Sequence, residues 1–299
     1  MTQSILLTGA NGFTGRALAH ALKTKGFQVI ELTGLKGASE GQIACDLTDR
    51  QGLAALINRL KVDRVIHLAA ISFVASADTQ EFYRTNVVGT CHLLEALVAA
   101  DKRPEQVIIA SSSNVYGIPG DSSPLSESSP LLPINHYACS KLAMEHMART
   151  FSDELNITIT RPFNYTGVGQ ADHFLVPKIV AHFASKAPFI ELGNLDVSRD
   201  FTGIDDVVSA YLSLIEKNVH GQTLNICSGV SISLRDIVAE LSLLSAHDIE
   251  VRSNVDFVRK NEIKALCGDS RKLQRMTGWA VSHPFKNVLR DMLNAAAER

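Results

Sequence analysis

No stretch of this sequence approaches the roughly 20 consecutive apolar residues that a membrane-spanning helix requires. Neither sign of charge is in excess, because 29 lysines and arginines face 31 aspartates and glutamates, a formal net charge of −2. We therefore expect neither nucleic acid nor an anionic membrane as a partner. The first ten residues, MTQSILLTGA, also lack the basic start and longer apolar run of a secretory signal, so we expect a cytoplasmic protein.

Cysteine is scarce and scattered. The five cysteines form no CxxC pair and no metal-ligand spacing with histidine. Because they are few, widely spread and odd in number, we expect buried, reduced thiols and no metal site. The five are Cys45, Cys91, Cys139, Cys227 and Cys267.

Strand-like and helix-like segments alternate over the first half of the chain. Residues 4–8 form a short apolar run, and residues 16–25 show apolar side chains at helical spacing. The alternation continues through 64–70, 86–100, 106–112, 137–151 and 157–164. Because these strands are mostly apolar on both faces, the pattern predicts an α/β fold with a Rossmann-type, doubly wound parallel sheet.

Three glycines, Gly9, Gly12 and Gly15, follow the first strand directly and open the first helix. That placement offers backbone N–H groups and the positive end of a helix to a pyrophosphate, and so predicts a dinucleotide-binding turn. A flexible loop that binds nothing is the alternative interpretation of the glycines alone.

The end of the second strand bears on the choice of cofactor. Proteins that bind NAD commonly place a carboxylate there to hold the ribose 2′-hydroxyl. Here the strand ends at Thr33, Glu31 falls earlier in the strand, and Arg16 and Lys36 are the nearby cations. A 2′-phosphate would not be repelled, so we expect NADP(H) to be favoured, with NAD(H) as the alternative.

A tyrosine and a lysine in YACSK, Tyr137 and Lys141, are four residues apart and share one helix face. Upstream, SSSNVYG ends another strand, at the sheet edge where open α/β folds bind ligands. Tyrosine has a reference pKa of about 10, and a neighbouring lysine cation would lower it. A serine hydroxyl beside them can hydrogen-bond the oxygen on which charge develops. This combination predicts hydride transfer at a carbonyl carbon, with Tyr137 moving the proton.

Six motifs, in order along the chain, together resemble the extended short-chain dehydrogenase/reductase family, whose members act on nucleotide sugars. They are TGANGFTG, HLAA (67–70), NVVGT (86–90), SSSNVYG (111–117), YACSK (137–141) and RPFN (161–164). The resemblance implies that Ser112, Tyr137 and Lys141 form the catalytic triad. It also implies a homodimer through the helices near 86–100 and 137–151.

The same resemblance implies residues that bind the cofactor, in the glycine turn, at the ends of neighbouring strands and beside the nicotinamide. They are Gly9, Asn11, Gly12, Phe13, Thr14, Gly15, Thr33, Asp46, Leu47, Leu68, Ala69, Ala70, Asn86, Tyr137, Lys141, Pro162 and Asn164. Asp46 and Leu47 would contact the adenine, although Asp46 also fits the role of an ordinary strand-end aspartate.

The C-terminal half is similar to that of reductases of GDP-4-keto-6-deoxy-D-mannose, in RPFNYTGVGQ, ELGNLDVSRDF, DDVVSAY, LNICSG and GDSRKLQRMTGW. The similarity implies reduction of the C4 ketone to GDP-D-rhamnose or to its C4 epimer, GDP-6-deoxy-D-talose. Ser113 and Asn114 stand where related dehydratases carry acidic residues, so we do not expect dehydration. The substrate-binding candidates are Phe73, Ser112, Ser113, Asn114, Asn164, Val176, Lys178, Gly193, Arg199, Arg259 and Arg271, the arginines because their planar forks grip phosphate.

We expect a dinucleotide-binding domain over residues 1–164, to which parts of 195–228 return, and a smaller α/β lobe for the sugar nucleotide over 165–299. The long Ser- and Pro-rich segment 119–135 has the position of a lid. Two other functions stay open: a nucleotide-sugar 4-epimerase with tightly bound NAD, and a non-catalytic NADP(H)-binding sensor. The lack of a carboxylate at Thr33 counts against the first, and the intact triad counts against the second.

Overall fold

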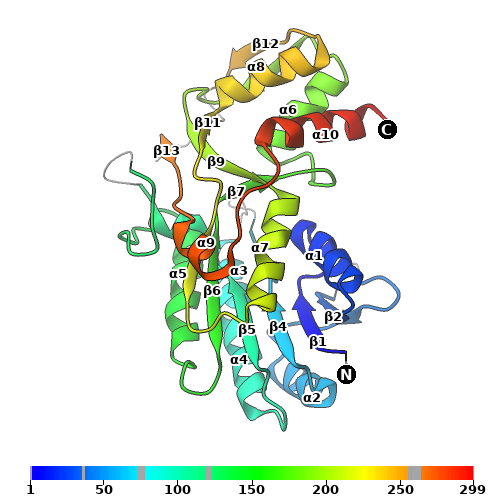
Figure 1. Cartoon of the computed structure of the whole chain (residues 1–299), viewed down its shortest axis with the longest axis vertical. Helices are drawn as coiled ribbons and strands as arrows, with labels where there is room; N and C mark the ends of the chain where they lie inside the picture. Colours follow the sequence, from blue (N-terminus) through cyan, green and yellow to red (C-terminus); the bar gives the residue numbers. More distant parts are fainter. Residues whose placement is uncertain are drawn as a thin grey trace.

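The computed structural model describes residues 2–35, 38–72, 78–118, 123–254, 257 and 264–298. Within these ranges the chain forms a lower lobe around a large sheet and an upper lobe that carries the C-terminus (Figure 1). Lys36, Phe73 and Arg259, which the sequence analysis singled out, lie outside the described residues.

The large sheet has seven strands, all paired in parallel, in the order β10-β6-β5-β4-β1-β2-β3. This is the Rossmann-type order, so the predicted fold class is confirmed. The strands are β1 (Ser4–Thr8), β2 (Gln28–Thr33), β3 (Ile43–Ala44), β4 (Arg64–His67), β5 (Gln106–Ala110), β6 (Ile157–Pro162) and β10 (Thr223–Ile226).

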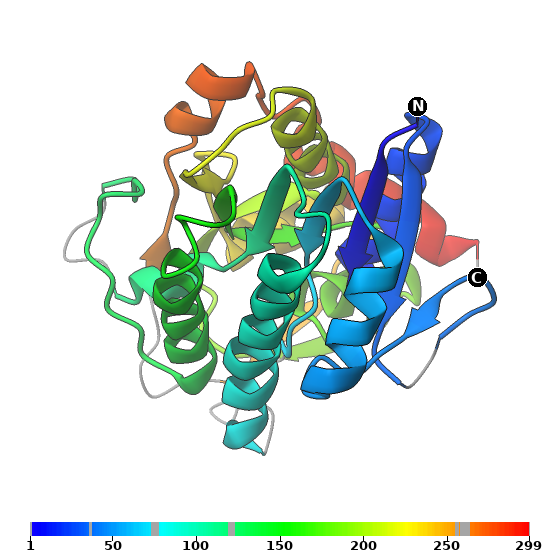
Figure 2. The same cartoon turned by 90° about the horizontal axis from the view of Figure 1, so that it is seen from below.

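Helices cover both faces of this sheet because each buries one apolar stripe against it. On one face, α1 (Phe13–Thr24) packs beside α7 (Ile204–Glu216), and both contribute to one apolar core. On the other face, α2 (Arg50–Leu60), α4 (Thr90–Ala99) and α5 (His136–Arg149) lie side by side over a second core (Figure 2). The carboxyl ends of the strands therefore open at one shared edge, between two layers of helices.

One predicted helix, 86–100, is divided in the structure. The short α3 (Thr79–Tyr83) runs into a π-helical turn, Arg84–Gly89, before α4 begins. The predicted strand 64–70 is also shorter, because β4 ends at His67. After β4 the segment Leu68–Ile71 leaves the sheet, and Asn86 of the π-helical turn binds its last residue, Ile71. Such π-helical turns are frequent near functional sites.

The upper lobe has a separate apolar core between two small sheets and three helices. One sheet joins β9 (Ser198–Gly203) to β7 (Asn164–Thr166), β11 (Ser231–Ser233) and β13 (Ala265–Leu266), and the other pairs β8 (Phe189–Leu192) with β12 (Glu250–Ser253). The helices are α6 (Leu175–Ala184), α8 (Leu234–Ser245) and α10 (Phe285–Ala297). The helix start predicted at Ser233 is confirmed, since Ser233 and Asp236 form a capping box.

The C-terminal half also returns to the lower lobe. Besides β10, the short α9 (Arg271–Thr277) packs there, and Leu273 and Trp279 belong to the core around α1 and α7. Among the helices of the described residues, none combines the length and apolar character needed to span a membrane. Of the five cysteines, all unpaired, Cys227 is buried and the other four are partly exposed, which corrects the expectation that all five are buried.

Candidate active site

The glycine turn lies between the carboxyl end of β1 and the start of α1. Gly9 has φ +69°, and a Cβ on Gly15 would lie 2.1 Å from the carbonyl oxygen of Gly9, so only glycine fits this tight turn. Gly12 starts α1 without a side-chain cap, which leaves the first backbone N–H groups for an anion. The guanidinium of Arg16 donates to the carbonyl oxygen of Asn11 and holds the turn from outside. These features fit a dinucleotide pyrophosphate.

Tyr165, on β7, is bound to this turn and was missed by the sequence analysis. Its ring stacks on that of Phe13 at 6.2 Å between centroids, and its hydroxyl lies 2.8 Å from that of Thr14. Arg16 also reaches the carbonyl oxygen of Gly169, in the loop after β7. Since 151 residues separate Tyr165 from Thr14, no local pattern could predict their contact. The one signal near Tyr165 was its position directly after the motif RPFN.

The end of β2 carries Thr33, as predicted, and its side chain is buried. The Thr33 hydroxyl donates to the carbonyl oxygen of Gly34 at 3.2 Å. Asp46 is exposed after β3, and one of its carboxylate oxygens accepts hydrogen bonds from the N–H and hydroxyl of Thr48. Leu47 is buried and packs in the core under α2 and α4.

The end of β4 is held by a buried histidine. His67 places Nδ1 2.7 Å from the hydroxyl of Thr8 and Nε2 2.8 Å from that of Thr90. Thr8 in turn accepts a hydrogen bond from the backbone N–H of Ala69. Burial lowers the pKa of His67 to about 3, so its ring is neutral near pH 7 and links β1, β4 and α4 without a charge.

Asn86, in the π-helical turn, holds the residues that follow β4. Its amide oxygen accepts from the N–H of Ile71, and its amide group donates to the carbonyl oxygen of Ile71 and to the hydroxyl of Ser140. Leu68 and Ala70 are half-buried in the segment that Asn86 positions. The side chain of Asn86 thus acts on the backbone of this segment and on α5.

The predicted triad converges at the carboxyl end of β5. The side chain of Ser112 lies close enough to the Tyr137 hydroxyl to lower its pKa. Tyr137 lies in the first turn of α5, which Asn135 caps, and Lys141 lies one turn further along. The ammonium group of Lys141 donates to the carbonyl oxygen of Ala110, the last residue of β5, at 2.7 Å. This bond fixes the helix against the strand that leads to Ser112.

Burial sets the protonation of the triad. It raises the pKa of Tyr137 to about 12, while the hydrogen bond from Ser112 acts in the opposite direction. Burial lowers the pKa of Lys141 to about 8, against the attraction of the Glu145 carboxylate. Desolvation therefore dominates at Tyr137 and keeps the phenol protonated near neutral pH, while a lowering of its pKa by Lys141 together with an oxidised nicotinamide stays a prediction.

The residues after Ser112 contain no carboxylate. Ser113 is buried, and Asn114 donates to the Ser112 hydroxyl through its backbone N–H and its side-chain amide, at 3.2 and 3.1 Å. They open a short 3₁₀ turn, Ser113–Tyr116, that ends at Gly117. Gly117 has φ +67°, and a Cβ there would lie 1.7 Å from the carbonyl oxygen of Leu132, so the chain before Tyr137 packs directly on this turn.

A buried ion pair supports α5 from behind. Arg161 makes two hydrogen bonds to the carboxylate of Glu145, at 2.9 and 2.6 Å, and both side chains are 1% exposed. Arg161 also donates to the hydroxyl of Tyr116, which donates to the side-chain oxygen of Asn225. The network joins α5, the turn after Ser112, β6 and β10, so it restrains both parts of the triad.

Two of the predicted substrate residues meet in the upper lobe. Lys178, on α6, lies over the ring of Phe257 at 4.4 Å and donates to the carbonyl oxygen of Glu191 at 3.1 Å. A Cβ on Gly193 would lie 2.7 Å from the carbonyl oxygen of Phe257, so the backbones are in contact there. Asn254 donates to the Glu191 carboxylate at 3.4 Å. These residues form a polar cluster with one aromatic face.

Other predicted residues lie along the strands between the lobes. Asn164 is exposed at the start of β7, one residue beyond the end of β6 at Pro162. Arg199 lies on the neighbouring β9, and its guanidinium donates to the carbonyl oxygen of Ser198 at 2.8 Å. Val176 is buried in the upper-lobe core, so its side chain packs inward.

Arg271 lies apart from these residues. It pairs with the carboxylate of Asp269 at the start of α9, and it lines a groove with Ile157 and Thr223, the first residues of β6 and β10. The triad follows the opposite, carboxyl ends of the large sheet, so the structure does not bring Arg271 to it. No group of histidine, cysteine, aspartate and glutamate side chains within the described ranges could hold a metal ion.

Comparisons with known proteins agree with this geometry. The profile of the GDP-mannose 4,6 dehydratase family matches residues 6–292. The GDP-6-deoxy-D-talose 4-dehydrogenase of Aggregatibacter actinomycetemcomitans is 38% identical over 275 residues, covering 92% of this chain and 91% of that protein. The GDP-6-deoxy-D-mannose reductase of Pseudomonas aeruginosa is 31% identical over 304 residues, covering 98% and 97%.

A solved structure supports the same relationship. The structure of RMD from Pseudomonas aeruginosa in complex with NADPH superimposes with a TM-score of 0.88 at 31% sequence identity, and the match covers 100% of both chains.

Proposed function

This chain belongs to the GDP-mannose 4,6 dehydratase family of extended short-chain dehydrogenases/reductases, and from that premise we propose that it reduces the C4 ketone of GDP-4-keto-6-deoxy-D-mannose. It is an NAD(P)-dependent nucleotide-sugar 4-oxidoreductase. The product is GDP-D-rhamnose or GDP-6-deoxy-D-talose, and the 38% identity to a GDP-6-deoxy-D-talose enzyme favours the second. The observation that carries the proposal is the meeting of three buried side chains, Ser112, Tyr137 and Lys141, at the carboxyl end of β5.

The roles of the three residues follow from their contacts. Tyr137 donates its phenolic proton to the C4 oxygen of the sugar as the carbonyl is reduced, and Ser112, which lies beside that hydroxyl, binds the same oxygen. The high pKa of Tyr137 suits this direction, because the residue must be protonated before turnover. A bound nicotinamide dinucleotide would supply the hydride.

Lys141 stabilises the negative charge that Tyr137 acquires when it gives up its proton. Its ammonium group is held at the end of β5, and its charge persists only below a pKa of about 8. The pairing of Glu145 with Arg161 keeps a carboxylate one turn below Lys141 and so favours the protonated lysine. The reaction is therefore expected to slow as the pH rises through about 8.

We propose that the enzyme prefers NADPH to NADH. Gly9, Gly12 and Gly15 would hold its pyrophosphate at the start of α1. Thr33 places no carboxylate at the end of β2, so a 2′-phosphate meets no like charge from that side chain. The NADPH complex of the related Pseudomonas aeruginosa protein supports this preference.

The diphosphate and base of the substrate would be held by the upper lobe. Arg199, on β9, and Lys178, on α6, are the cations we assign to the phosphates. The space beside Gly193 that was expected to admit the base is taken by the backbone carbonyl group of Phe257. Dehydration is disfavoured because Ser113 and Asn114 leave no carboxylate beside Ser112 to remove a proton.

The test is turnover. Purified protein is mixed with GDP-4-keto-6-deoxy-D-mannose and NADPH, NADPH absorbance is followed, and the configuration at C4 is read by NMR. Consumption of NADPH with formation of a 6-deoxy sugar supports the proposal, and no turnover with either NADPH or NADH contradicts it. Protein that retains NAD⁺ and interconverts a sugar nucleotide without net cofactor use would instead be a 4-epimerase.

We further propose a cytoplasmic homodimer. Its contact would run over the helices near 86–100 and 137–151, where Val88 is 43% exposed although apolar. The five unpaired thiols suit a reducing compartment. A monomeric mass by light scattering at micromolar concentration would contradict the dimer.

A further inference from the structure

A polar groove lies at the far end of the catalytic helix from the triad. Its volume is about 840 Å³, within the range of small-molecule sites, and it is bounded by the end of α5, the starts of β6 and β10, the 126–128 loop and α9. Tyr137 and Arg149 mark the two ends of α5. Twelve residues apart, they are separated by about 18 Å at 1.5 Å per residue, so the groove is distinct from the catalytic centre.

Positive charge exceeds negative charge in this groove. Arg149, Arg271, Lys272 and Arg275 line it, against the carboxylates of Glu127 and Asp269. The chain as a whole has a formal net charge of −2, so this local excess is a feature of the groove and not of the surface in general. Arginine forks and an ammonium group facing one cavity are the chemistry that binds phosphate oxygens.

Two of these cations are held by neutral groups. Lys272 donates to the carbonyl oxygen of Thr223 at 2.9 Å, and Arg149 donates to the Thr223 hydroxyl at 3.2 Å. Neither bond cancels the charge of the donor; Arg149 also lies 3.7 Å from the carboxylate of Glu145, which it shares with Arg161. The site is therefore partly preorganised before any ligand enters, which lowers the entropic cost of binding.

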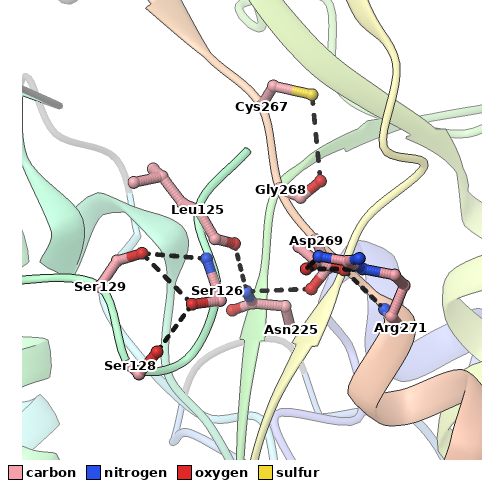
Figure 3. Close-up of polar contacts among 9 residues, drawn as sticks. All are labelled: Leu125, Ser126, Ser128, Ser129, Asn225, Cys267, Gly268, Asp269 and Arg271. Carbon is pink, nitrogen blue, oxygen red and sulfur yellow. Dashed lines mark hydrogen bonds and ion pairs between the residues drawn. The ribbon is translucent and has the colours of Figure 1, made fainter. Parts of the chain in front are cut away.

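The remaining wall is fixed by polar contacts that Figure 3 draws. Arg271 lies against the carboxylate of Asp269, to which its Nε donates at 2.9 Å and its terminal nitrogen at 2.6 Å. On the facing loop, the hydroxyls of Ser126 and Ser128 are 2.9 Å apart (Figure 3). Asn225 bridges the two sides, because its amide group donates to the carbonyl oxygens of Leu125 and Asp269. Hydrogen bonds thus join the loop and the helix into one rim of the groove.

We propose that this groove is a binding site for a small phosphorylated molecule of the diphosphate class, separate from the site of the reaction. Its cations would contact the phosphate oxygens, the hydroxyls of Ser126 and Ser128 would donate to them, and Ile157 and Ile159 provide an apolar floor for the organic part. The proposal does not depend on which sugar nucleotide the enzyme reduces.

The groove is also connected to the catalytic residues. Arg149 and Tyr137 share α5, and the loop that carries Ser126 leads to the start of that helix. Leu125 is tied to the C-terminal segment by hydrogen bonds with Cys267 and Asp269. Occupancy of the groove is therefore expected to stabilise the loop that precedes Tyr137.

The experiment is calorimetric titration with inorganic pyrophosphate at low salt, with saturating NADPH to fill the cofactor site. The wild-type protein should show saturable binding that weakens as salt is added. Arg275→Glu should bind at least about tenfold more weakly, because one attraction becomes a repulsion, and Arg275→Lys should keep most of the affinity. Arg235→Glu, which changes an exposed arginine on α8 outside the groove, is the matched control and should bind like the wild type.

Three outcomes overturn the proposal: no saturable binding by the wild type, equal affinity of the wild type and Arg275→Glu, or binding that Arg199→Ala abolishes and Arg275→Glu does not. The last result would place the anion at the substrate site. NADPH oxidation by Arg275→Glu, measured without pyrophosphate, should match the wild type. A groove that binds pyrophosphate in a protein without reductase activity would contradict the proposed function and leave this inference intact.

Discussion

The catalytic edge of the large sheet and the substrate side of the upper lobe are built in different ways. Ser112, Tyr137 and Lys141 are 7%, 8% and 3% exposed, and each is held by at least one hydrogen bond. On the side proposed for the substrate, Lys178 and Arg199 are only partly buried, and each donates a hydrogen bond to a backbone carbonyl group. The proposed function thus assigns chemistry to buried, desolvated residues and recognition to partly hydrated ones.

This difference has an electrostatic consequence. Charges in the buried edge interact in a medium of low polarity, so small changes of contact there alter pKa values strongly. Charges on the substrate side are screened by water and salt, so each cation contributes modestly. Substitutions should therefore affect rate at the first region and affinity at the second.

The largest effect is expected for Tyr137→Phe. Loss of the phenolic proton donor should lower kcat by about 10²–10⁴-fold, the usual contribution of a general acid. The affinity for NADPH, measured by fluorescence titration, should remain within about threefold, since the ring and its packing on Phe82 are kept. A variant that keeps more than a tenth of the wild-type kcat would contradict the assigned role.

Gly15→Ala tests the rigidity of the same region. Its new Cβ would lie 2.1 Å from a backbone oxygen that cannot move freely, so we expect a loss of about 1–3 kcal/mol in unfolding free energy and weaker NADPH binding. Gly34→Ala is the control for stability, because a Cβ there meets no heavy atom within 4 Å. Urea unfolding of the two variants should separate them clearly; equal midpoints would show that the turn relaxes.

Arg199→Ala probes the substrate side. We expect KM for the nucleotide sugar to rise about tenfold with kcat changed less, because a phosphate contact contributes to binding of substrate and transition state alike. Arg235→Ala is the matched control, since it removes an exposed arginine paired with Asp196 on the same lobe. A fall in kcat with unchanged KM would move Arg199 from recognition to the chemical step.

The smallest effect is expected for His67→Gln, on the pH dependence of the unfolding free energy. Its folded pKa of about 3 lies below the unfolded value of about 6.5, so only the unfolded chain takes up this proton at pH 4–6. The unfolding free energy should therefore decrease as the pH is lowered below 6.5, and this one histidine contributes up to about 1.4 kcal/mol per pH unit to the decrease. His67→Gln should have a shallower slope than the wild type in urea unfolding between pH 7 and 5, whereas the exposed His20→Gln should not.

Local motifs predicted most of the catalytic edge. The glycine turn and the residues of the triad are each specified within a few neighbouring residues, and strand–helix alternation predicted where their elements meet. The π-helical turn and the early end of β4 could not be predicted in this way. Both depend on contacts of Asn86 with Ile71 and Ser140, which lie in other elements.

Local sequence motifs could not predict the contacts between segments that are far apart in the chain. Asp200 shows why: its carboxylate accepts hydrogen bonds from the backbone N–H groups of Ser228, Gly229 and Gly268, and so joins three segments of the chain at one buried point. Backbone donors carry no sequence signature, so a pattern of residues cannot reveal such a junction. For Arg271 a motif was present, but it did not predict where the side chain lies. The motif resembles the family, and the side chain lines a groove at the end of the large sheet opposite the triad.

The sequence by itself determined the fold class and predicted the dinucleotide turn and the catalytic residues, because backbone conformation and side-chain chemistry at those sites are local properties. Only the tertiary structure decided how these residues are charged and what surrounds them. Burial raised the pKa of Tyr137 and lowered that of Lys141, and packing bound Tyr165 to the glycine turn. Desolvation and long-range contact arise only when distant segments exclude water together.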